Sequence, residues 1–264
     1  MTEASVTFGP GLTLERDGPV ATLVLNRPEQ RNALTGAMWR ALPEVCDAVL
    51  RDVAVRVLVV RGAGEEAFSG GADIAEMQQL FSDPSVLHAF GDAVQVGQDR
   101  LAALPLPTIA RIAGACAGGG CGIALACDLR IASDDSFFAV PPAKLGLVYS
   151  LADTLRLVDL VGPSHAKDML FTGRRVNARE AHEWGLVNQV VPRARLDVAL
   201  GETVAQIRGA AHSSIVAAKR IVAQIAAGAR SETPESRRLY DESFTSKDFQ
   251  EGARAFLAKR KPEF

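Results

Sequence analysis

Apolar residues in the first part of the chain follow two different periods. Short runs predict two strands, Leu12–Glu15 and Val20–Leu25, around the turn Asp17-Gly18-Pro19. Val55–Val60 is rich in β-branched residues, which predicts a buried strand. Between the last two of these, apolar residues recur every three or four positions from Thr35 to about Arg51, which predicts an amphipathic helix capped by Thr35. Pro43 lies inside this helix and is expected to kink it.

The alternation continues to about residue 150 and then gives way to helical patterns. Helices are expected through Met77 and Leu80 and over Val86–Leu104, and the region after Leu151 is mostly helical. Further strands are expected at Thr108–Ile112, Leu129–Ala132 and Leu186–Val191, and the last helix from about Lys247 to Arg260. We therefore predict an α/β core over residues 1–195 and a helical region over residues 196–264.

Composition narrows the class of protein. The 264 residues are 48% hydrophobic and 23% charged, which is typical of a globular protein with a large core. A net charge of -2 argues against nucleic acid as a partner. No secretory signal or membrane span is evident. The four cysteines form no C-x-x-C pair, and this argues against a zinc site. Buried, reduced thiols and a cytoplasmic location are expected.

Glycine clusters follow two of the predicted strands. Gly70-Gly71-Ala72-Asp73 comes after Val55–Val60, and Gly118-Gly119-Gly120 comes after Thr108–Ile112 and opens a helix-like run. Consecutive glycines allow close backbone approach, and a helix N-terminus favours an anion. Neither the dinucleotide motif G-x-G-x-x-G nor a P-loop Gly-Lys pair is present. If one N–H from each turn points at the same oxygen, the two form an oxyanion hole. The alternative is two unrelated packing turns.

Several motifs resemble the enoyl-CoA hydratase/isomerase (crotonase) family, in the order and spacing of that family and nearly from end to end. They are Asn26-Arg27-Pro28 with Asn32-Ala33-Leu34, Phe68 to Ile74 with Glu76-Met77, Gly114 with Gly118-Gly119-Gly120 and Cys127-Asp128, Gly173 with Ala178, Ala181 and Gly185-Leu186-Val187, and Phe256 to Pro262.

This resemblance implies a spiral core of strand-strand-helix units and C-terminal helices that build a trimer or a dimer of trimers. It implies an acyl-CoA thioester substrate, with no cofactor apart from the CoA of that substrate. The thioester carbonyl is expected between the N–H groups of Ala72 and Gly119. CoA contacts are implied for Arg31, Ala33, Ala72, Asp73, Ile74 and Lys259. For Lys259 a solvated charge at a helix end is the alternative.

The chain departs from the family pattern where hydratases carry two glutamates. Gly122 and Pro142 stand at those positions, and Ser150 matches a position where some isomerases carry an acid. Glycine and proline cannot orient water or transfer protons. Standard hydration of crotonyl-CoA is therefore expected to be very slow or absent.

Tyr149 suggests a different reaction. The register of Pro142, Leu145-Gly146 and Tyr149 resembles the methylmalonyl-CoA decarboxylase branch of the family, although that branch has histidine at Ala72 and glutamate at Gly122. Decarboxylation leaves a thioester enolate that an oxyanion hole stabilises, and a phenol can orient the departing carboxylate. Asp153 is the nearest acid after Tyr149, with a helix-start role as its alternative, and Ser150 is equally ambiguous.

The leading hypothesis is a lyase that processes acyl-CoA through an enolate, in either an atypical hydratase-like or a decarboxylase-like reaction. The catalytic candidates are Ala72, Gly119, Tyr149, Ser150 and Asp153. The alternative is an acyl-CoA-binding member of the family without catalysis. A serine hydrolase is disfavoured because the chain has no G-x-S-x-G sequence.

Overall fold

The computed structural model describes residues 4–80 and 83–264. These form two compact units. The first holds most of the chain up to Leu200, and the second holds Pro105–Pro107 with Gly201–Phe264. The boundary expected after residue 195 lies at the start of helix α7 (Leu196–Arg208), whereas the change of unit falls inside that helix.

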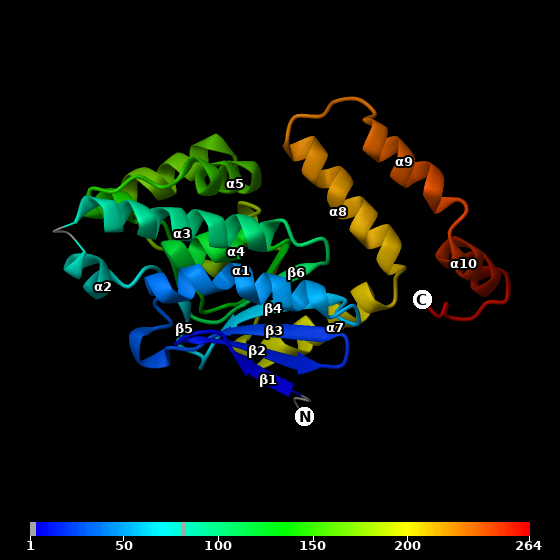
Figure 1. Cartoon of the computed structure of the whole chain (residues 1–264), viewed down its shortest axis with the longest axis horizontal. Helices are drawn as coiled ribbons and strands as arrows, with labels where there is room; N and C mark the ends of the chain where they lie inside the picture. The colour runs from blue at the N-terminus through cyan, green and yellow to red at the C-terminus, as the bar shows by residue number, and fades with distance from the viewer. Residues whose placement is uncertain (1–3, 81–82) are drawn as a thin grey trace. The chain divides into compact units, whose positions relative to one another are not determined.

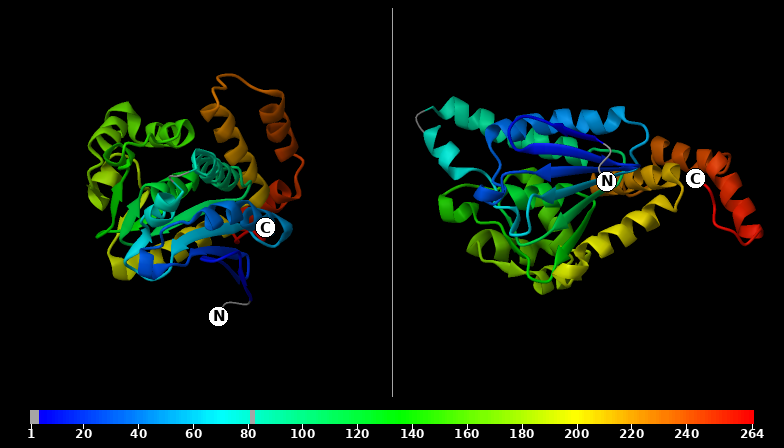
Figure 2. Two further views of the ribbon diagram at one scale, coloured as in Figure 1. Left: turned by 60° about the vertical axis from the view of Figure 1, so that its left-hand side comes forward. Right: turned by 90° about the horizontal axis from the view of Figure 1, so that it is seen from below.

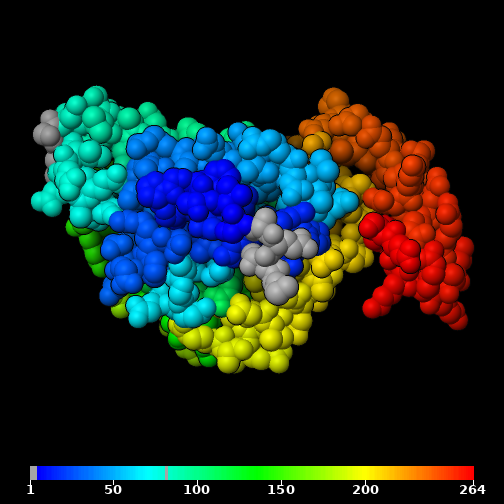
Figure 3. Space-filling view, turned by 60° about the horizontal axis from the view of Figure 1, so that its bottom comes forward, coloured from blue at the N-terminus to red at the C-terminus, as the bar shows by residue number. Residues whose placement is uncertain are grey.

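The larger sheet of the first unit has the strand order β1-β2-β3-β4-β6-β8-β11 among the described residues. From β3 onward neighbouring strands are parallel, and β1, β2 and β3 are antiparallel. The edge strand β1 lies on the surface of the unit, in dark blue in Figure 3. The strands are β1 (Ala4–Thr7), β2 (Leu12–Asp17), β3 (Val20–Leu25), β4 (Val57–Gly62), β6 (Thr108–Ile112), β8 (Leu129–Ser133) and β11 (Gln189–Val191).

A smaller sheet carries the turns of interest. Its strand order is β10-β9-β7-β5, with β5, β7 and β9 parallel and β10 antiparallel to β9. Because β5 and β7 are parallel neighbours, the turns that follow them leave the sheet at the same edge. Its strands are β5 (Ala67–Ser69), β7 (Ala115–Ala117), β9 (Phe137–Ala139) and β10 (Val176–Asn177).

Helix α1 (Gly36–Arg51) confirms the amphipathic pattern read from the sequence. The Thr35 side chain accepts a hydrogen bond from the Met38 N–H, and the helix continues through Pro43. Since a proline within a helix removes one backbone donor, packing must hold this segment helical. The buried face of α1 includes apolar residues at this helical spacing, namely Met38, Trp39, Leu42, Val45, Cys46 and Val49.

The other helices of the first unit lie beside α1 and at the ends of the strands. Helix α3 packs against α1, α4 against α3, and α5 against α4 (Figure 1). The larger sheet lies beneath this helical layer in the view of Figure 1. These elements are α2 (Ile74–Gln79), α3 (Pro84–Ala102), α4 (Gly119–Ala126), α5 (Leu151–Thr172), α6 (Ala178–Glu183) and the short 3-10 turns η1 (Pro28–Gln30), η2 (Pro142–Leu145) and η3 (Arg193–Arg195).

The second unit is helical. Helices α8 and α9 lie side by side, and α10 follows them (Figures 1 and 2). Thr233 caps α9 through a capping box with Ser236, and Pro234 begins the helix. The helices are α8 (His212–Ala226), α9 (Pro234–Ser243) and α10 (Lys247–Leu257). Among the described residues, none of the helices combines the length and apolar character needed to cross a membrane.

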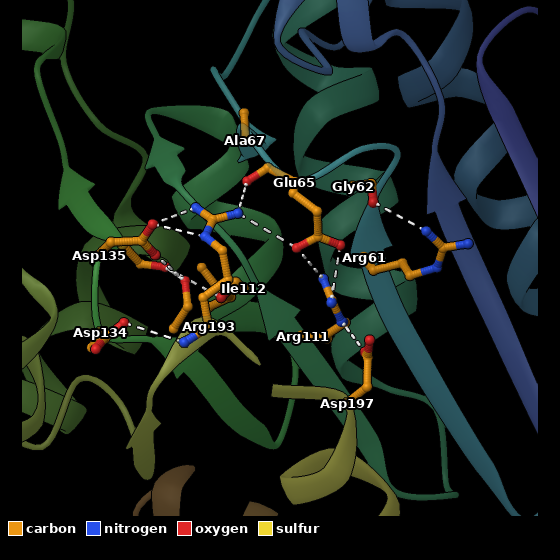
Figure 4. A network of polar contacts seen from close by, with 12 residues as sticks. Arg61, Gly62, Glu65, Ala67, Arg111, Ile112, Asp134, Asp135, Arg193 and Asp197 are labelled. Atoms are coloured by element: carbon orange, nitrogen blue, oxygen red, sulfur yellow. Dashed lines mark hydrogen bonds and ion pairs between the residues drawn. The ribbon is translucent and has the colours of Figure 1, made fainter. Parts of the chain in front are cut away.

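An ionic network fastens the loop after β4 to the neighbouring strands (Figure 4). Arg111 of β6 is only 5% exposed, and its Nε donates to Asp197 of α7 at 2.6 Å while its Nη2 donates to Glu65 at 3.1 Å. Arg193 pairs with Glu65 and with Asp135. Although burial opposes the charge of Arg111, the carboxylates of Asp197 and Glu65 raise its pKa above the ordinary value. Charged hydrogen bonds thus link β6, η3 and α7 to the loops that follow β4 and β8.

Candidate active site

The two glycine turns lie against each other, as the parallel pairing of β5 and β7 requires. The register places Ser69 opposite Cys116, so Gly70–Ala72 and Gly118–Gly120 both emerge beyond these residues. Gly71 has a φ of 101°, and a Cβ there would lie 2.8 Å from the Ala117 carbonyl oxygen and 3.2 Å from the Gly119 nitrogen. Glycine at position 71 is therefore required by both backbone conformation and space.

Two backbone donors are available where the turns meet. A Cβ built on Gly119 would lie 3.6 Å from the Ala72 nitrogen, so the two N–H groups are close neighbours. Within residues 4–80 and 83–264, neither the Ala72 N–H nor the Gly119 N–H has an acceptor. Gly119 is the first residue of α4, and Gly118 provides no side-chain cap. Both residues are half-buried, so an oxygen placed between them can accept from two donors in partial shelter from water.

The loop before α1 supports the first turn from the other side. The Leu34 N–H donates to the Gly71 carbonyl at 2.7 Å, and the Asp73 N–H donates to the Leu34 carbonyl at 2.9 Å. Asp73 caps α2 and pairs with Arg27 at 2.8 Å. Burial opposes ionisation of Asp73, but the hydrogen bond from Arg27 holds the pKa of this carboxyl below its ordinary value. Ala72 is thus held between two fixed neighbours.

The residues expected to contact CoA fall in two places. Arg31 is exposed, has a left-handed φ of 51°, and lies in the loop with half-buried Ala33. Ile74, the first residue of α2, is 47% exposed. Asp73 and Ile74 directly follow Ala72 in the chain. Arg31 and Ala33 belong to the loop that is hydrogen-bonded to Gly70 and Gly71 of this turn. Lys259 is an exposed residue of the second unit just after α10, so its contact with CoA remains a proposal.

Tyr149 reaches the second glycine turn. Its hydroxyl donates to the Gly118 carbonyl at 3.2 Å, and its side chain is half-buried. Loss of solvation, followed by the proximity of Cys121 and Asp153, raises the pKa of this phenol well above its ordinary value. Tyr149 is therefore a neutral donor next to the turn that carries Gly119.

Ser150 has the structural role that its sequence position left open. Its hydroxyl accepts from the Asp153 N–H at 3.0 Å, which makes it the N-cap of α5. This capping contact satisfies one of the unpaired donors at the helix start.

Asp153 lies in the first turn of α5, but unlike a solvated residue at a helix start it is only 3% exposed. Arg156 Nη1 donates to it at 3.3 Å. Burial raises the pKa of Asp153 above its ordinary value, while Ser150, Arg156 and Gln98 partly offset this effect. A second polar group, Gln98 of α3, is 1% exposed and lies beside it.

The sequence analysis did not identify Gln98, although one signal was present. The buried residues of α3 are Phe90, Gly97, Gln98 and Leu101, so Gln98 is a polar residue on the apolar face of an amphipathic helix. A polar side chain in such a position needs a hydrogen-bonding partner. The identity of that partner, Asp153, depends on tertiary structure.

Neither of the positions at which family hydratases carry glutamates, Gly122 and Pro142, has a titratable side chain. Gly122 is buried in α4, and Pro142 begins η2. All four cysteines are buried and unpaired by disulfides, and in the described part of the chain no group of His, Cys, Asp and Glu residues is arranged to hold a metal ion. The polar groups next to the second glycine turn are thus the backbone N–H of Gly119, the Tyr149 hydroxyl and the Asp153 carboxyl with Gln98.

Comparison with known proteins defines the class to which this fold and site belong. The chain is a member of the enoyl-CoA hydratase/isomerase family, which it matches over residues 15–264. It is 38% identical over 260 residues to a probable enoyl-CoA hydratase of Rhizobium meliloti, covering 96% of this chain and 97% of that protein. It is 37% identical over 261 residues to the crotonyl-CoA hydratase of Syntrophomonas wolfei, with coverage of 96% and 97%.

A solved structure gives the same result for the fold. An enoyl-CoA hydratase/isomerase family protein from Hyphomonas neptunium superimposes with a TM-score of 0.93 at 37% identity, covering 98% of this chain and 99% of that one. The predicted crotonase fold, with an α/β core and C-terminal helices, is confirmed.

Proposed function

We propose that this chain is a lyase that converts an acyl-CoA thioester through an enolate, with the carbonyl oxygen held by the N–H groups of Ala72 and Gly119. The observation that carries the proposal is the contact of two strand-end turns that each present an N–H without an acceptor in the described residues. Negative charge that develops on the oxygen is stabilised by two such donors, typically by several kcal/mol.

Proton transfer is assigned to groups other than the two family glutamates. Gly122 and Pro142 provide none, whereas the Tyr149 hydroxyl and the buried Asp153 carboxyl lie next to α4. A neutral phenol can donate a hydrogen bond to a polar acyl substituent, and a carboxyl group can accept or return a proton. Ser150 acts as the cap that orients this helix start.

Two reactions fit this arrangement. A decarboxylase-like reaction is supported by Tyr149 beside the second turn, because loss of CO2 generates the enolate directly. An atypical hydratase-like reaction is supported by relatives whose names describe hydratases, including the crotonyl-CoA hydratase of Syntrophomonas wolfei. Arg31, Ala33, Asp73 and Ile74, together with Lys259, are proposed to contact the CoA moiety of the substrate.

The alternative is an acyl-CoA-binding protein of the same family that has lost catalysis. The absence of acids at Gly122 and Pro142 favours it, and the two acceptor-free N–H groups favour the enzyme. We further propose that the protein acts in the cytoplasm as a trimer or dimer of trimers.

A small substrate panel distinguishes these functions. Purified protein is mixed with crotonyl-CoA and with methylmalonyl-CoA, and products are followed by mass spectrometry beside a binding measurement for each thioester. We expect turnover of at least one substrate, with crotonyl-CoA hydration well below about 10 per second, the value of a typical enzyme. Binding without any product supports the non-catalytic alternative. Hydration at a typical rate contradicts the roles given to Gly122 and Pro142.

A further inference from the structure

The space that a side chain at Gly122 would need is already occupied. Gly122 lies one helical turn beyond Gly119 on the same face of α4. A Cβ there would stand 2.0 Å from the terminal amide of Gln98 and 3.2 Å from Oδ1 of Asp153. Two polar groups, from α3 and α5, therefore converge at the place where α4 has no side chain.

These two groups are hydrogen-bonded to each other. With the Gln98 amide oriented so that its NH2 group faces the carboxylate, its nitrogen donates to Asp153 Oδ1 at 2.9 Å and to Oδ2 at 3.0 Å. The other polar atom of the amide, the oxygen in this orientation, then faces Gly122. Since Gln98 and Asp153 are almost fully buried, these bonds fix the carboxyl group in one position.

The pair is connected to the surface through α5 and α3. Arg156 donates to Asp153 and also pairs with Asp99, whose side chain is 46% exposed. Among ionisable groups, Arg156 and Tyr149 act on the carboxyl group directly, and Asp99 pairs with Arg156. The Cys116 and Cys121 thiols are neighbours of Tyr149. Arg156 is the cation that balances Asp153 within this set. The carboxyl group is therefore held in a buried position by one amide and one guanidinium group.

We propose that Gln98 is a positioning residue that holds the Asp153 carboxyl group against the Gly122 face of α4, where this carboxyl group exchanges a proton with Cα of a bound acyl-CoA. This inference rests on the proposed function. In the step, the Asp153 carboxylate takes the proton, the Cα–H bond breaks, and its electron pair forms the enolate whose oxygen lies between Ala72 and Gly119. The reverse step returns the proton to Cα. A saturated acyl-CoA with a hydrogen at Cα, such as butyryl-CoA, meets the chemical requirement for this exchange.

The experiment measures uptake of deuterium at Cα of butyryl-CoA in D2O by mass spectrometry, using the full chain. Gln98→Leu removes both hydrogen bonds at similar volume, and Gln95→Leu, at an exposed position of the same helix, is the matched control. We expect Gln98→Leu to slow exchange about 10- to 100-fold, with butyryl-CoA affinity within about threefold of wild type. Exchange within about twofold of wild type overturns the inference.

A second variant gives a readout that packing alone does not move. In Gln98→Glu the introduced carboxyl group donates to Asp153 when it is protonated and repels Asp153 when it is ionised. The activity of this variant relative to wild type is therefore expected to rise as the pH falls, and to be lowest where both groups are ionised. A ratio that is constant across pH overturns the inference even if Gln98→Leu fails to fold.

The packing part of the inference is tested without activity. Gly122→Ala is expected to lower the melting temperature in the wild-type background and to do so much less in a Gln98→Ala background, because the amide is then gone. Equal shifts in the two backgrounds contradict the placement of Gln98. If wild-type protein turns over an acyl-CoA but exchanges no proton with butyryl-CoA, the inference fails and the proposed function stands. If it does neither, the proposed function itself fails. If exchange survives in Gln98→Leu, only the role of Gln98 fails.

Discussion

At the scale of single residues, the site consists of groups whose neighbours leave them little freedom. An added Cβ would be too close to the Ala117 carbonyl at Gly71, to the Gln98 amide at Gly122, and to the Trp39 ring, at 2.9 Å, at Gly119. Each of these three positions therefore requires glycine because an atom of another part of the fold occupies the space. The sequence reveals the glycines but not the atoms that require them.

Tyr149→Phe tests the residue closest to the second turn. The change keeps the ring but removes the hydroxyl that donates to Gly118. We expect turnover of the responsive acyl-CoA to fall about 10- to 1000-fold, because one placed polar group is lost, while CoA affinity and melting temperature stay nearly unchanged. Steady-state rates, CoA binding and thermal unfolding are measured on one preparation. A lower melting temperature with unchanged turnover per folded molecule assigns the tyrosine to packing.

At the scale of elements, hydrophobic periodicity and capping residues predicted most of the fold. The stripe from Met38 to Val49 and the cap at Thr35 define α1, and β2, β3 and β6 lie where the sequence predicted strands. Local pattern succeeds here because each element buries one face. The strand expected over Leu186–Val191 is shorter, with β11 limited to Gln189–Val191, because only these residues pair with β8. The Gln98–Asp153 pair joins α3 to α5, and no local pattern specifies such a contact.

Arg111→Ala tests the ionic network of Figure 4. The stem of Arg111 is buried in the core unit, whereas its partners Glu65 and Asp197 are more than half exposed. We expect a loss of about 1–3 kcal/mol in the free energy of unfolding, from lost packing and lost charged hydrogen bonds. Arg61→Ala is the control, because its pair with Glu15 is partly exposed and contributes less than about 1 kcal/mol. Equal losses in urea unfolding contradict a special role for Arg111.

At the scale of the whole molecule, the second unit exposes more aromatic surface than a single chain needs. Tyr240, Phe244 and Phe249 are each 54% exposed, and Phe256 and Leu257 are each 82% exposed. The rings of Tyr240, Phe244 and Phe249 contact one another in sequence order. Exposed apolar surface of this kind is typical of an interface between protein chains. The family resemblance predicted this role for the C-terminal helices, whereas composition alone gave no partner.

The oligomer is tested by light scattering during gel filtration at micromolar concentration. We expect the mass of three or six chains, since closed symmetric assembly covers these side chains in every subunit. Replacing both Phe256 and Leu257 with Asp is expected to lower the mass, while Val53→Asp, at an exposed position of the first unit, leaves it unchanged. A monomeric wild-type mass contradicts the prediction.

The central claim is that the N–H groups of Ala72 and Gly119 bind one thioester oxygen, and infrared spectroscopy of the bound carbonyl measures this directly. Butyryl-CoA labelled with ¹³C at the carbonyl is compared free and bound. Two hydrogen bonds weaken the C=O bond, so the bound stretch is expected at lower frequency than the free one. In Gly119→Ala the added Cβ would lie 2.9 Å from the Trp39 ring, so the Gly119 N–H should be displaced and the shift largely abolished. Gly91→Ala, with open space around it, should retain the shift. A bound carbonyl that absorbs at the free frequency in wild-type protein contradicts the account.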